Sequence, residues 1–224
     1  MEIEIAPAPA TAPADGVADG LAARLRASTS AEHRNTESRG FIVRLMEGEL
    51  SLAEYARYLA QFVRVYEAME SRPLSAADPA PVRDTAVHRA ESGNADLVAL
   101  GAADWRETIP ALPATERYVA HLRAFGANDG FLHLAHHYTR YLGDLSGGQI
   151  IATMLRRGYD ATDDQLTFYR FDAIDNQVHY KRAYRTALDG LELDEAQAQL
   201  VVDEAKRAFD YSGGILDDLG STLR

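Results

Sequence analysis

The sequence predicts an all-α protein, a compact single-domain fold of roughly seven or eight helices. Apolar residues recur at spacings of three and four along most of the chain, which is the period of an amphipathic helix. No segment shows the period-two alternation of a half-buried strand, and there is no internal repeat. A chain of 224 residues with 46% hydrophobic residues is long and apolar enough to form one sizeable core.

The first sixteen residues, MEIEIAPAPATAPADG, predict a disordered tail rich in alanine and proline. They contain neither the basic region nor the apolar region of a secretory signal. No apolar run reaches the roughly 18 residues that a membrane span needs. We therefore expect a tail over 1–16, a helical domain over 17–224, and a cytoplasmic protein that is not bound to a membrane.

Local signals place the helices of the first half of the chain. Residues 17–39 form the first expected helix, whose apolar start gives way to a polar stretch around His33. Ser51 and Glu54 form a capping box, which predicts the start of a long amphipathic helix. That helix is expected to end at Arg72, because Pro73 cannot continue it.

The remaining helices are expected at 82–92, 94–100, 115–125, 131–157, 171–188 and 194–219. Loops separate them where proline or glycine interrupts the helical pattern. Pro110 and Pro113 lie in one such loop, and the sequence GANDG over 126–130 predicts a turn.

Charge and composition exclude several classes of function. The net charge of −11 argues against nucleic acid or an anionic membrane surface as a partner. The absence of cysteine excludes disulfides, thiolate nucleophiles and cysteine-ligated iron. Lys181 and Lys206 are the only lysines, so any basic site must rely mainly on arginine.

Seven histidines supply candidate metal ligands, since histidine is the natural axial ligand of haem iron when cysteine is absent. The segment HLAHH spaces His133, His136 and His137 for a metal site, but a polar stripe along one helix face is the favoured interpretation. A carboxylate-bridged di-iron site needs glutamate with histidine three residues later. No glutamate of this sequence has one.

His33 has a more informative context than the other histidines. Glu32 precedes it and Glu37 follows one helical turn later, where a carboxylate can orient an imidazole through its second nitrogen. On spacing alone, however, the segment EHRNTES favours an exposed histidine among charged residues.

The segment YTRYLGDLSGGQ carries three glycines, each of which weakens a helix by about 1 kcal/mol relative to alanine. Gly143 and Gly147 share one helix face, and Gly148 lies beside them. They permit either close packing of another helix or close approach of a flat ligand. Asp144 is then either a group that positions a proton donor or the partner of Arg140 in a salt bridge.

The segment AHHYTRYLGDLSGGQ closely resembles the signature of haem oxygenases. The resemblance extends from about Leu21 to Leu219, and it includes the stretches LRASTSAEHRNTES, FVRVYEAME and YKRAYRTALDGLEL. It implies a helical enzyme for which haem is both substrate and cofactor.

The resemblance also implies roles for individual residues. His33 is the expected iron ligand and Glu37 its hydrogen-bonding partner. The three glycines let the distal helix lie over the haem and flex, with the Gly143 backbone next to the bound oxygen. The residues expected to hold a proton-donating water network are Asp144, Tyr66, Thr139 and Arg140. The residues expected to contact the haem ring or its propionates are Arg26, Tyr138, Lys181, Arg185 and Phe209.

The implied role of Arg26 departs in one respect from the pattern of the family. Arg26 lies seven residues before His33, a spacing of two helical turns that lets both residues share one side of a helix. It is an arginine where relatives often have lysine, which keeps the charge but changes its geometry. We expect cleavage at the α-meso carbon, although this depends on how such contacts orient the ring.

The implied reaction is oxidative cleavage of haem to biliverdin, CO and ferrous iron with O2. The sequence has no GxGxxG flavin or nicotinamide motif, so we expect electrons from a ferredoxin or a flavin reductase that docks at a local arginine patch. Two alternatives remain at this point. One is a haem carrier or sensor without degradation, and the other is a helical interaction module without a cofactor.

Overall fold

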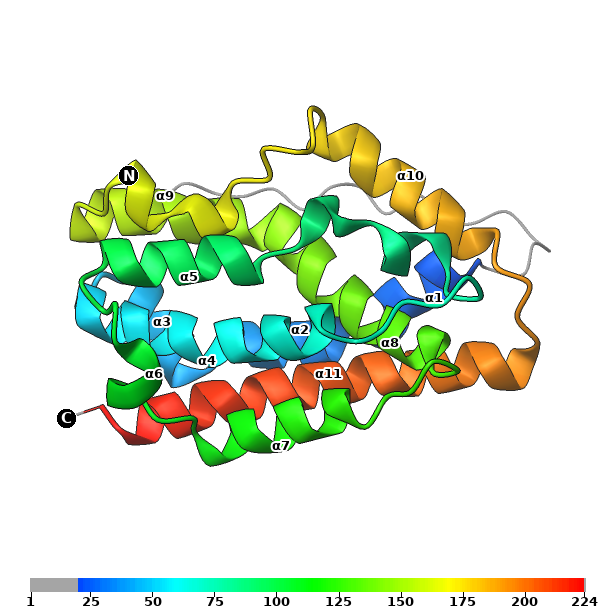
Figure 1. The fold of residues 1–224 in the computed structure, drawn as a ribbon, viewed down its shortest axis with the longest axis horizontal. Coiled ribbons are helices and arrows are strands. Elements are labelled where there is room, and N and C mark those ends of the chain that lie inside the picture. Colours follow the sequence, from blue (N-terminus) through cyan, green and yellow to red (C-terminus); the bar gives the residue numbers. More distant parts are fainter. Residues whose placement is uncertain (1–19, 224) are drawn as a thin grey trace.

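The computed structural model describes residues 20–223, so the tail predicted at 1–16 lies outside the described residues. Every regular element in this part of the chain is helical (Figure 1), as predicted. The helices pack around the long C-terminal helix and around the helix that begins after Ser51.

The segment expected as one helix over 17–39 is divided, so that prediction is wrong. At Thr29 the backbone leaves helical geometry, with φ −106° and ψ 6°. The buried Thr29 hydroxyl donates to the Leu25 carbonyl at 2.7 Å, a bond that commonly bends a helix. The resulting short helices are α1 (Leu21–Ser28), α2 (Ser30–Glu37) and α3 (Gly40–Met46).

Helix α4 (Leu52–Glu70) starts where the capping box predicted. The Glu54 amide donates to Ser51 Oγ at 3.2 Å, and the Ser51 amide donates to Glu54 Oε2 at 2.6 Å. The helix ends two residues before the predicted end at Arg72. Most of its side chains are buried, so it is a core helix rather than a surface helix.

The helix expected over 82–92 is wrong. Two 3₁₀ turns occupy this region, η1 (Ala80–Arg83) and η2 (Thr85–Val87). Between them the Asp84 side chain accepts from the Ala86 amide at 2.9 Å, an Asx-type bond that competes with helix formation. The next α-helix, α5 (Ala90–Ala99), begins where Glu70 Oε1 accepts from the Arg89 amide at 2.6 Å.

The glycine-bearing segment is the least regular of the long helical stretches. After α6 (Trp105–Thr108) and α7 (Pro113–Arg123), α8 spans Gly130–His137. Two π-helical turns follow, η3 (Tyr138–Leu142) and η4 (Asp144–Gly148), before α9 (Gln149–Tyr159). The helix weakness predicted from the glycines thus coincides with π turns, which are frequent at functional sites.

The C-terminal part begins later than expected. Residues 171–176 are not helical, and α10 (Gln177–Asp189) starts where the Asn176 side chain accepts from the His179 amide at 2.9 Å. Short 3₁₀ turns precede it, at η5 (Asp163–Gln165) and η6 (Thr167–Tyr169). Helix α11 (Glu195–Ser221) is the longest element described, and it packs against α8, α7, α2 and α3.

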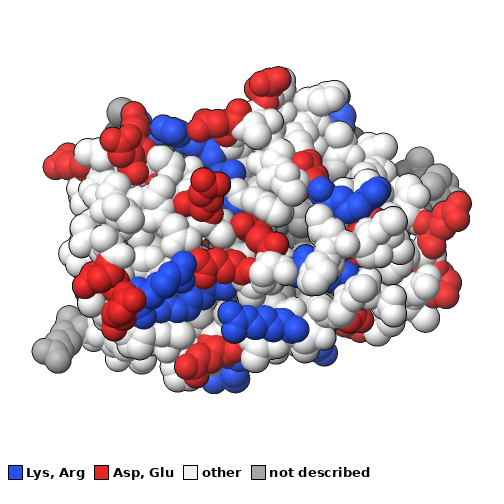
Figure 2. All heavy atoms as spheres, viewed as in Figure 1, with Lys and Arg blue, Asp and Glu red and all other residues white. Residues whose placement is uncertain are grey.

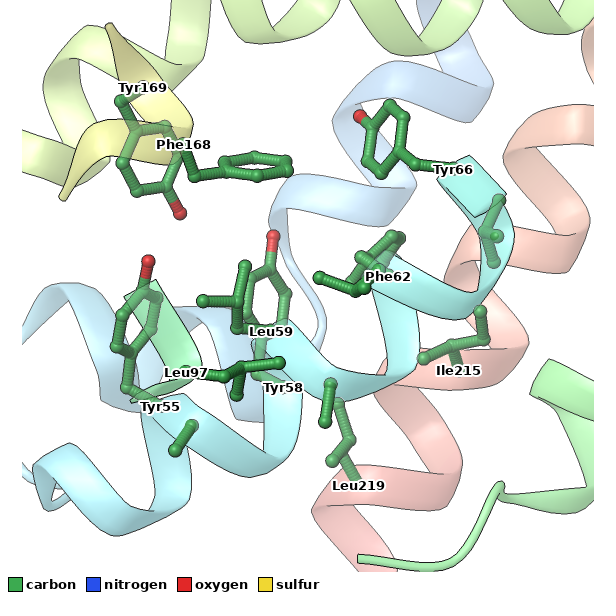
Figure 3. Close-up of a cluster of buried hydrophobic side chains, with 14 of the residues drawn as sticks. Tyr55, Tyr58, Leu59, Phe62, Tyr66, Leu97, Phe168, Tyr169, Ile215 and Leu219 are labelled. Carbon is green, nitrogen blue, oxygen red and sulfur yellow. The ribbon is translucent and has the colours of Figure 1, made fainter. Parts of the chain in front are cut away.

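The core lies where α4 meets α5 and α11. Figure 3 shows Tyr55, Leu59 and Phe62 of α4 beside Leu97 of α5 and beside Ile215 and Leu219 of α11. Tyr66, at the far end of α4, reaches toward the segment that holds the glycines. The core therefore fixes one wall of the candidate site.

The surface carries both signs of charge. Figure 2 shows acidic and basic side chains interspersed over one face of the molecule. Across residues 20–223, no helix combines the length and apolar character that crossing a membrane requires.

Candidate active site

Tyr66, Asp144 and Arg140 form a buried polar cluster between α4 and the π turns. The Tyr66 hydroxyl donates to Asp144 Oδ2. Arg140 Nε donates to the Tyr66 oxygen at 3.2 Å, and its Nη2 lies 3.6 Å from Asp144 Oδ1. The salt bridge between Arg140 and Asp144 is therefore present, and it is part of a larger cluster.

Burial and neighbouring charges shift the proton affinities of this cluster. Burial raises the pKa of the Asp144 carboxyl, while Arg140 and the Tyr66 hydrogen bond oppose that rise. Burial also raises the pKa of Tyr66 well above its ordinary value. Burial lowers the pKa of Arg140, but the neighbouring Tyr66 and Asp144 raise it by more, so the guanidinium stays protonated. A carboxyl with a raised pKa beside a fixed hydroxyl is a group of the kind that serves as a general acid.

The three glycines do not face the same surroundings. A Cβ placed at Gly143 or Gly147 would meet no atom within 4 Å, so both positions border open space. A Cβ at Gly148 would lie 2.9 Å from Tyr169 Cδ1, so this glycine allows close packing against the core. Only the first two leave room for a ligand against the backbone.

His33 lies on α2 with its side chain 53% exposed. Its Nδ1 is 3.2 Å from Glu37 Oε2, one turn along the helix, as predicted. The Phe209 ring of α11 meets the imidazole edge-on, with ring centroids 5.8 Å apart. With Nδ1 engaged by the carboxylate, Nε2 is the nitrogen left for a metal ligand bond.

Helix α11 connects the histidine to the buried polar cluster. Phe209 contacts His33, and Ser212, three residues further along, accepts from Arg140 Nη1 at 3.3 Å. Residues three apart on a helix are neighbours. The candidate iron ligand and the candidate proton donors therefore flank the same turn of α11.

Cations predicted to bind propionates lie around the same region. Lys181 of α10 donates to the Leu145 carbonyl at 3.3 Å and to Ser146 Oγ at 3.2 Å, which attaches it to η4. Burial raises the pKa of Tyr138, and the positive charges of Arg185 and Arg26 oppose that rise. The break at Thr29 means that Arg26 and His33 belong to different helices.

Two residues have roles that differ from, or add to, the prediction. Thr139 Oγ1 donates to the Ala135 carbonyl at 2.8 Å, so in this structure it bonds to its own helix. Ser212 was not singled out in the sequence, although it is a fully buried polar residue on the apolar face of α11. A hydroxyl at such a position is a signal that could have identified it.

The HLAHH histidines do not form a metal site among themselves. All three are buried, and His136 and His137 have different polar partners. His137 Nδ1 lies 2.8 Å from the Tyr184 hydroxyl, and His136 Nε2 lies 2.8 Å from Glu204 Oε1. The polar positions of this helix thus point into the protein.

Comparison with known proteins gives a consistent result. Residues 19–218 match the family model described as "Heme oxygenase". Heme oxygenase 1 of a Nostoc species is 35% identical over 204 residues, covering 89% of this chain and 86% of that protein. Human heme oxygenase 1 is 31% identical, covering 89% of this chain and 71% of that protein.

Solved structures agree in fold. The crystal structure of heme oxygenase-1 from a Synechocystis species, in complex with heme, matches with a TM-score of 0.83 and 31% identity, covering 91% of this chain and 93% of that one. Heme oxygenase from Leptospira interrogans matches with a TM-score of 0.81 and 33% identity, covering 89% and 99%. The chain thus has the helical fold of an O2-dependent oxidoreductase of haem catabolism. More narrowly, the chain belongs to the haem oxygenase family.

Proposed function

We propose that this haem oxygenase binds haem between α2 and the π turns η3 and η4, with His33 Nε2 as the iron ligand. Three observations of this chain fit a flat ligand with a central metal and two carboxylates. Nε2 of His33 remains available, Gly143 and Gly147 border open space, and cationic side chains lie beside η3 and η4. Bound haem supplies the iron that activates O2 and the porphyrin that is cleaved.

The side chains of the pocket then have distinct tasks. Glu37 orients the His33 ring through Nδ1, and Phe209 limits its rotation. Arg26, Arg185, Lys181 and Tyr138 bind the propionates and set the rotation of the ring in the pocket. Gly143, Gly147 and Gly148 allow the π turns to approach the ring face, with Gly148 doing so indirectly through its contact with Tyr169.

Asp144 is the proposed proton donor, acting through ordered water. Tyr66 and Arg140 hold its carboxyl in one orientation, and Thr139 supports the helix from which Arg140 projects. The reaction proposed for this site yields the α isomer of biliverdin, CO and ferrous iron. The observation that carries the proposal is that Phe209, which contacts His33, and Ser212, which accepts from Arg140, lie within one turn of α11.

A haemin titration followed by reduction in air tests this proposal. We expect one haem to bind per chain, which is seen as a Soret band. Reduction in air should then remove that band and produce a biliverdin spectrum, and chromatography should identify the α isomer. A Soret band that persists under reductant and air would instead indicate the haem carrier or sensor. Absence of any Soret shift would exclude haem binding.

An external donor is proposed to supply the electrons, either a ferredoxin or a flavin reductase. The chain is acidic overall, so docking is proposed at a local arginine patch near the haem edge. Charged docking weakens as salt screens it. Turnover with a separate donor should therefore fall with ionic strength more than haem binding does, and turnover insensitive to salt would contradict this docking. The cytoplasmic location stays a prediction, which cell fractionation can test.

A further inference from the structure

Three side chains with metal-ligand atoms meet outside the haem site. His121 comes from α7, His136 from α8 and Glu204 from α11, and their ligand atoms all lie within 4.8 Å of one another. The Nε2 atoms of His121 and His136 lie 2.5 Å and 2.8 Å from Glu204 Oε1. Within residues 20–223, this is the one group of three such residues with that geometry.

The cluster is enclosed on most sides. The side chain of His136 is fully buried and that of Glu204 is 4% exposed, while His121 is 20% exposed and forms the open edge. The Phe125 ring lies 5.0 Å from the His121 ring and 5.5 Å from the His136 ring. Aromatic walls of this kind exclude water and strengthen the interaction between a cation and its ligands.

Neighbouring groups orient the ligand atoms toward a common centre. The Tyr118 hydroxyl lies 2.9 Å from His136 Nδ1, which leaves Nε2 as the nitrogen that faces Glu204. Arg207 Nη1 donates to Glu204 Oε2 at 3.0 Å, which leaves Oε1 to face both histidines. Metal-binding histidines and carboxylates are commonly held in this way through their second atom.

We propose that His121, His136 and Glu204 bind one divalent first-row transition metal ion, with Zn²⁺ as the probe. Two imidazoles and one carboxylate are ligands that zinc and ferrous iron accept, and a site with three protein ligands leaves a further position for water. The open edge at His121 is where that water lies and where the ion enters. The site is separate from the residues proposed to hold haem.

The three ligand atoms would need to move only slightly to form the coordination shell of a zinc ion. Atoms bound to zinc at about 2.0–2.1 Å are roughly 3.3 Å apart in a tetrahedral shell, compared with the 2.5 Å and 2.8 Å found here. His121, the least buried of the three, has the room to move outward. When the ion binds, the proton on each Nε2 moves to Nδ1 of the same ring, and the His136 Nδ1 proton is then donated to the Tyr118 oxygen.

The test measures zinc on the purified full-length chain by equilibrium dialysis against a chromophoric chelator. We expect one zinc ion per chain, and a rise in melting temperature on adding zinc. His121→Gln and Glu204→Gln should each weaken binding by about 100-fold or more, because even the loss of a group that only orients a ligand costs roughly 10–100-fold. Co²⁺ in place of zinc should give the visible absorption of a four- or five-coordinate site.

Two controls separate this site from other histidines. His179→Gln changes an exposed histidine of α10, and His33→Ala removes the proposed iron ligand. Both variants should keep the zinc ion. The proposal is overturned if the unmodified chain binds no zinc ion, if His33→Ala loses it, or if His121→Gln and Glu204→Gln bind zinc as tightly as the unmodified chain. Melting temperatures without metal show whether a variant has lost its fold. If one has, the number of zinc ions bound per unmodified chain decides whether the site exists.

Discussion

The Tyr66 hydroxyl donates a hydrogen bond to the Asp144 carboxylate, across 78 residues of sequence. This bond ties the core helix α4 to the π turn η4, and Arg140 contacts both partners. A buried carboxylate held by two donors has one orientation, whereas an exposed one samples many. The cluster therefore presents Asp144 to the proposed haem site in a fixed position.

Replacing Asp144 with asparagine should leave haem binding within about twofold but lower biliverdin formation by about 100-fold or more, the usual range for loss of a general acid. Asparagine keeps the size of the side chain and removes its titratable proton. The measurement is the rate of biliverdin growth after reduction in air. Asp217→Asn, at an exposed position of α11 that pairs with Arg39, is the matched control. Normal biliverdin output from the Asp144 variant would remove its proposed role.

Tyr66→Phe should shift the pH profile of turnover toward higher pH. The Tyr66 hydrogen bond lowers the pKa of Asp144 against the effect of burial, so removing it raises that pKa further. Leaving a buried acceptor without its donor also costs about 1–3 kcal/mol of stability. The profile is measured as biliverdin rate against pH. Tyr159→Phe, which loses a bond to the Leu45 carbonyl at 2.8 Å, should leave the profile unmoved. Coincident profiles for all three proteins would contradict the coupling.

Gly143→Ala and Gly148→Ala should have opposite consequences. A methyl group at 143 enters open space, so stability should stay the same or rise by up to about 1 kcal/mol, while haem affinity falls. A methyl group at 148 meets Tyr169 at 2.9 Å, and such overpacking typically costs about 1–3 kcal/mol. Urea unfolding and haem titration of both variants measure the two effects. If Gly143→Ala bound haem normally, the open space beside it would not be the haem site.

His33→Ala should abolish the spectral signature of an iron–imidazole bond, while haem can still enter the pocket. Glu37→Gln should keep the bond but weaken it, because a neutral amide is a poorer partner for Nδ1 than a carboxylate. Resonance Raman spectroscopy of the ferrous protein measures the iron–nitrogen stretch directly. Glu47→Gln, at an exposed position just after α3, serves as control. An unchanged stretch in His33→Ala would mean that another residue binds the iron.

Much of the fold could be predicted because its signals are local. The Ser51 capping box and the weakening of the helix by Gly143, Gly147 and Gly148 act within a few residues, and the structure shows the capping box and π turns at these glycines. The break at Thr29 and the 3₁₀ turns around Asp84 depend on single side-chain bonds to the backbone. Such bonds compete with a helix, and a pattern of apolar spacings does not reveal them, so unbroken helices were predicted there.

The site was less accessible to residue-by-residue reasoning, because its contacts are between distant segments. Spacing alone predicted the pairing of His33 with Glu37 and of Arg140 with Asp144. The approach of Tyr66 to Asp144 followed only from the family resemblance. The contact between His121 and Glu204 joins two helices through residues 83 positions apart in the sequence, and no local pattern indicates it.

Stability should fall as the pH drops below about 6.5, because of His133. This side chain is buried, its Nδ1 has no hydrogen-bond partner among the described residues, and burial together with the charge of Arg72 lowers its pKa to about 3. The unfolded chain therefore takes up a proton near pH 6.5 that the folded protein does not accept until about pH 3. In that window this one group should reduce the free energy of unfolding by about 1.4 kcal/mol per pH unit.

His133→Leu removes the titrating group and puts an apolar side chain of similar size in its place. Its free energy of unfolding should fall less steeply than that of the unmodified protein between pH 6 and 5. This range lies between the ordinary pKa of histidine, about 6.5, and that of the carboxyl groups, about 4. Urea unfolding at several pH values gives both slopes. His179→Gln should keep the original slope, since His179 is exposed. Equal slopes for the leucine variant and the unmodified protein would show that His133 takes up its proton in the folded state as readily as in the unfolded chain.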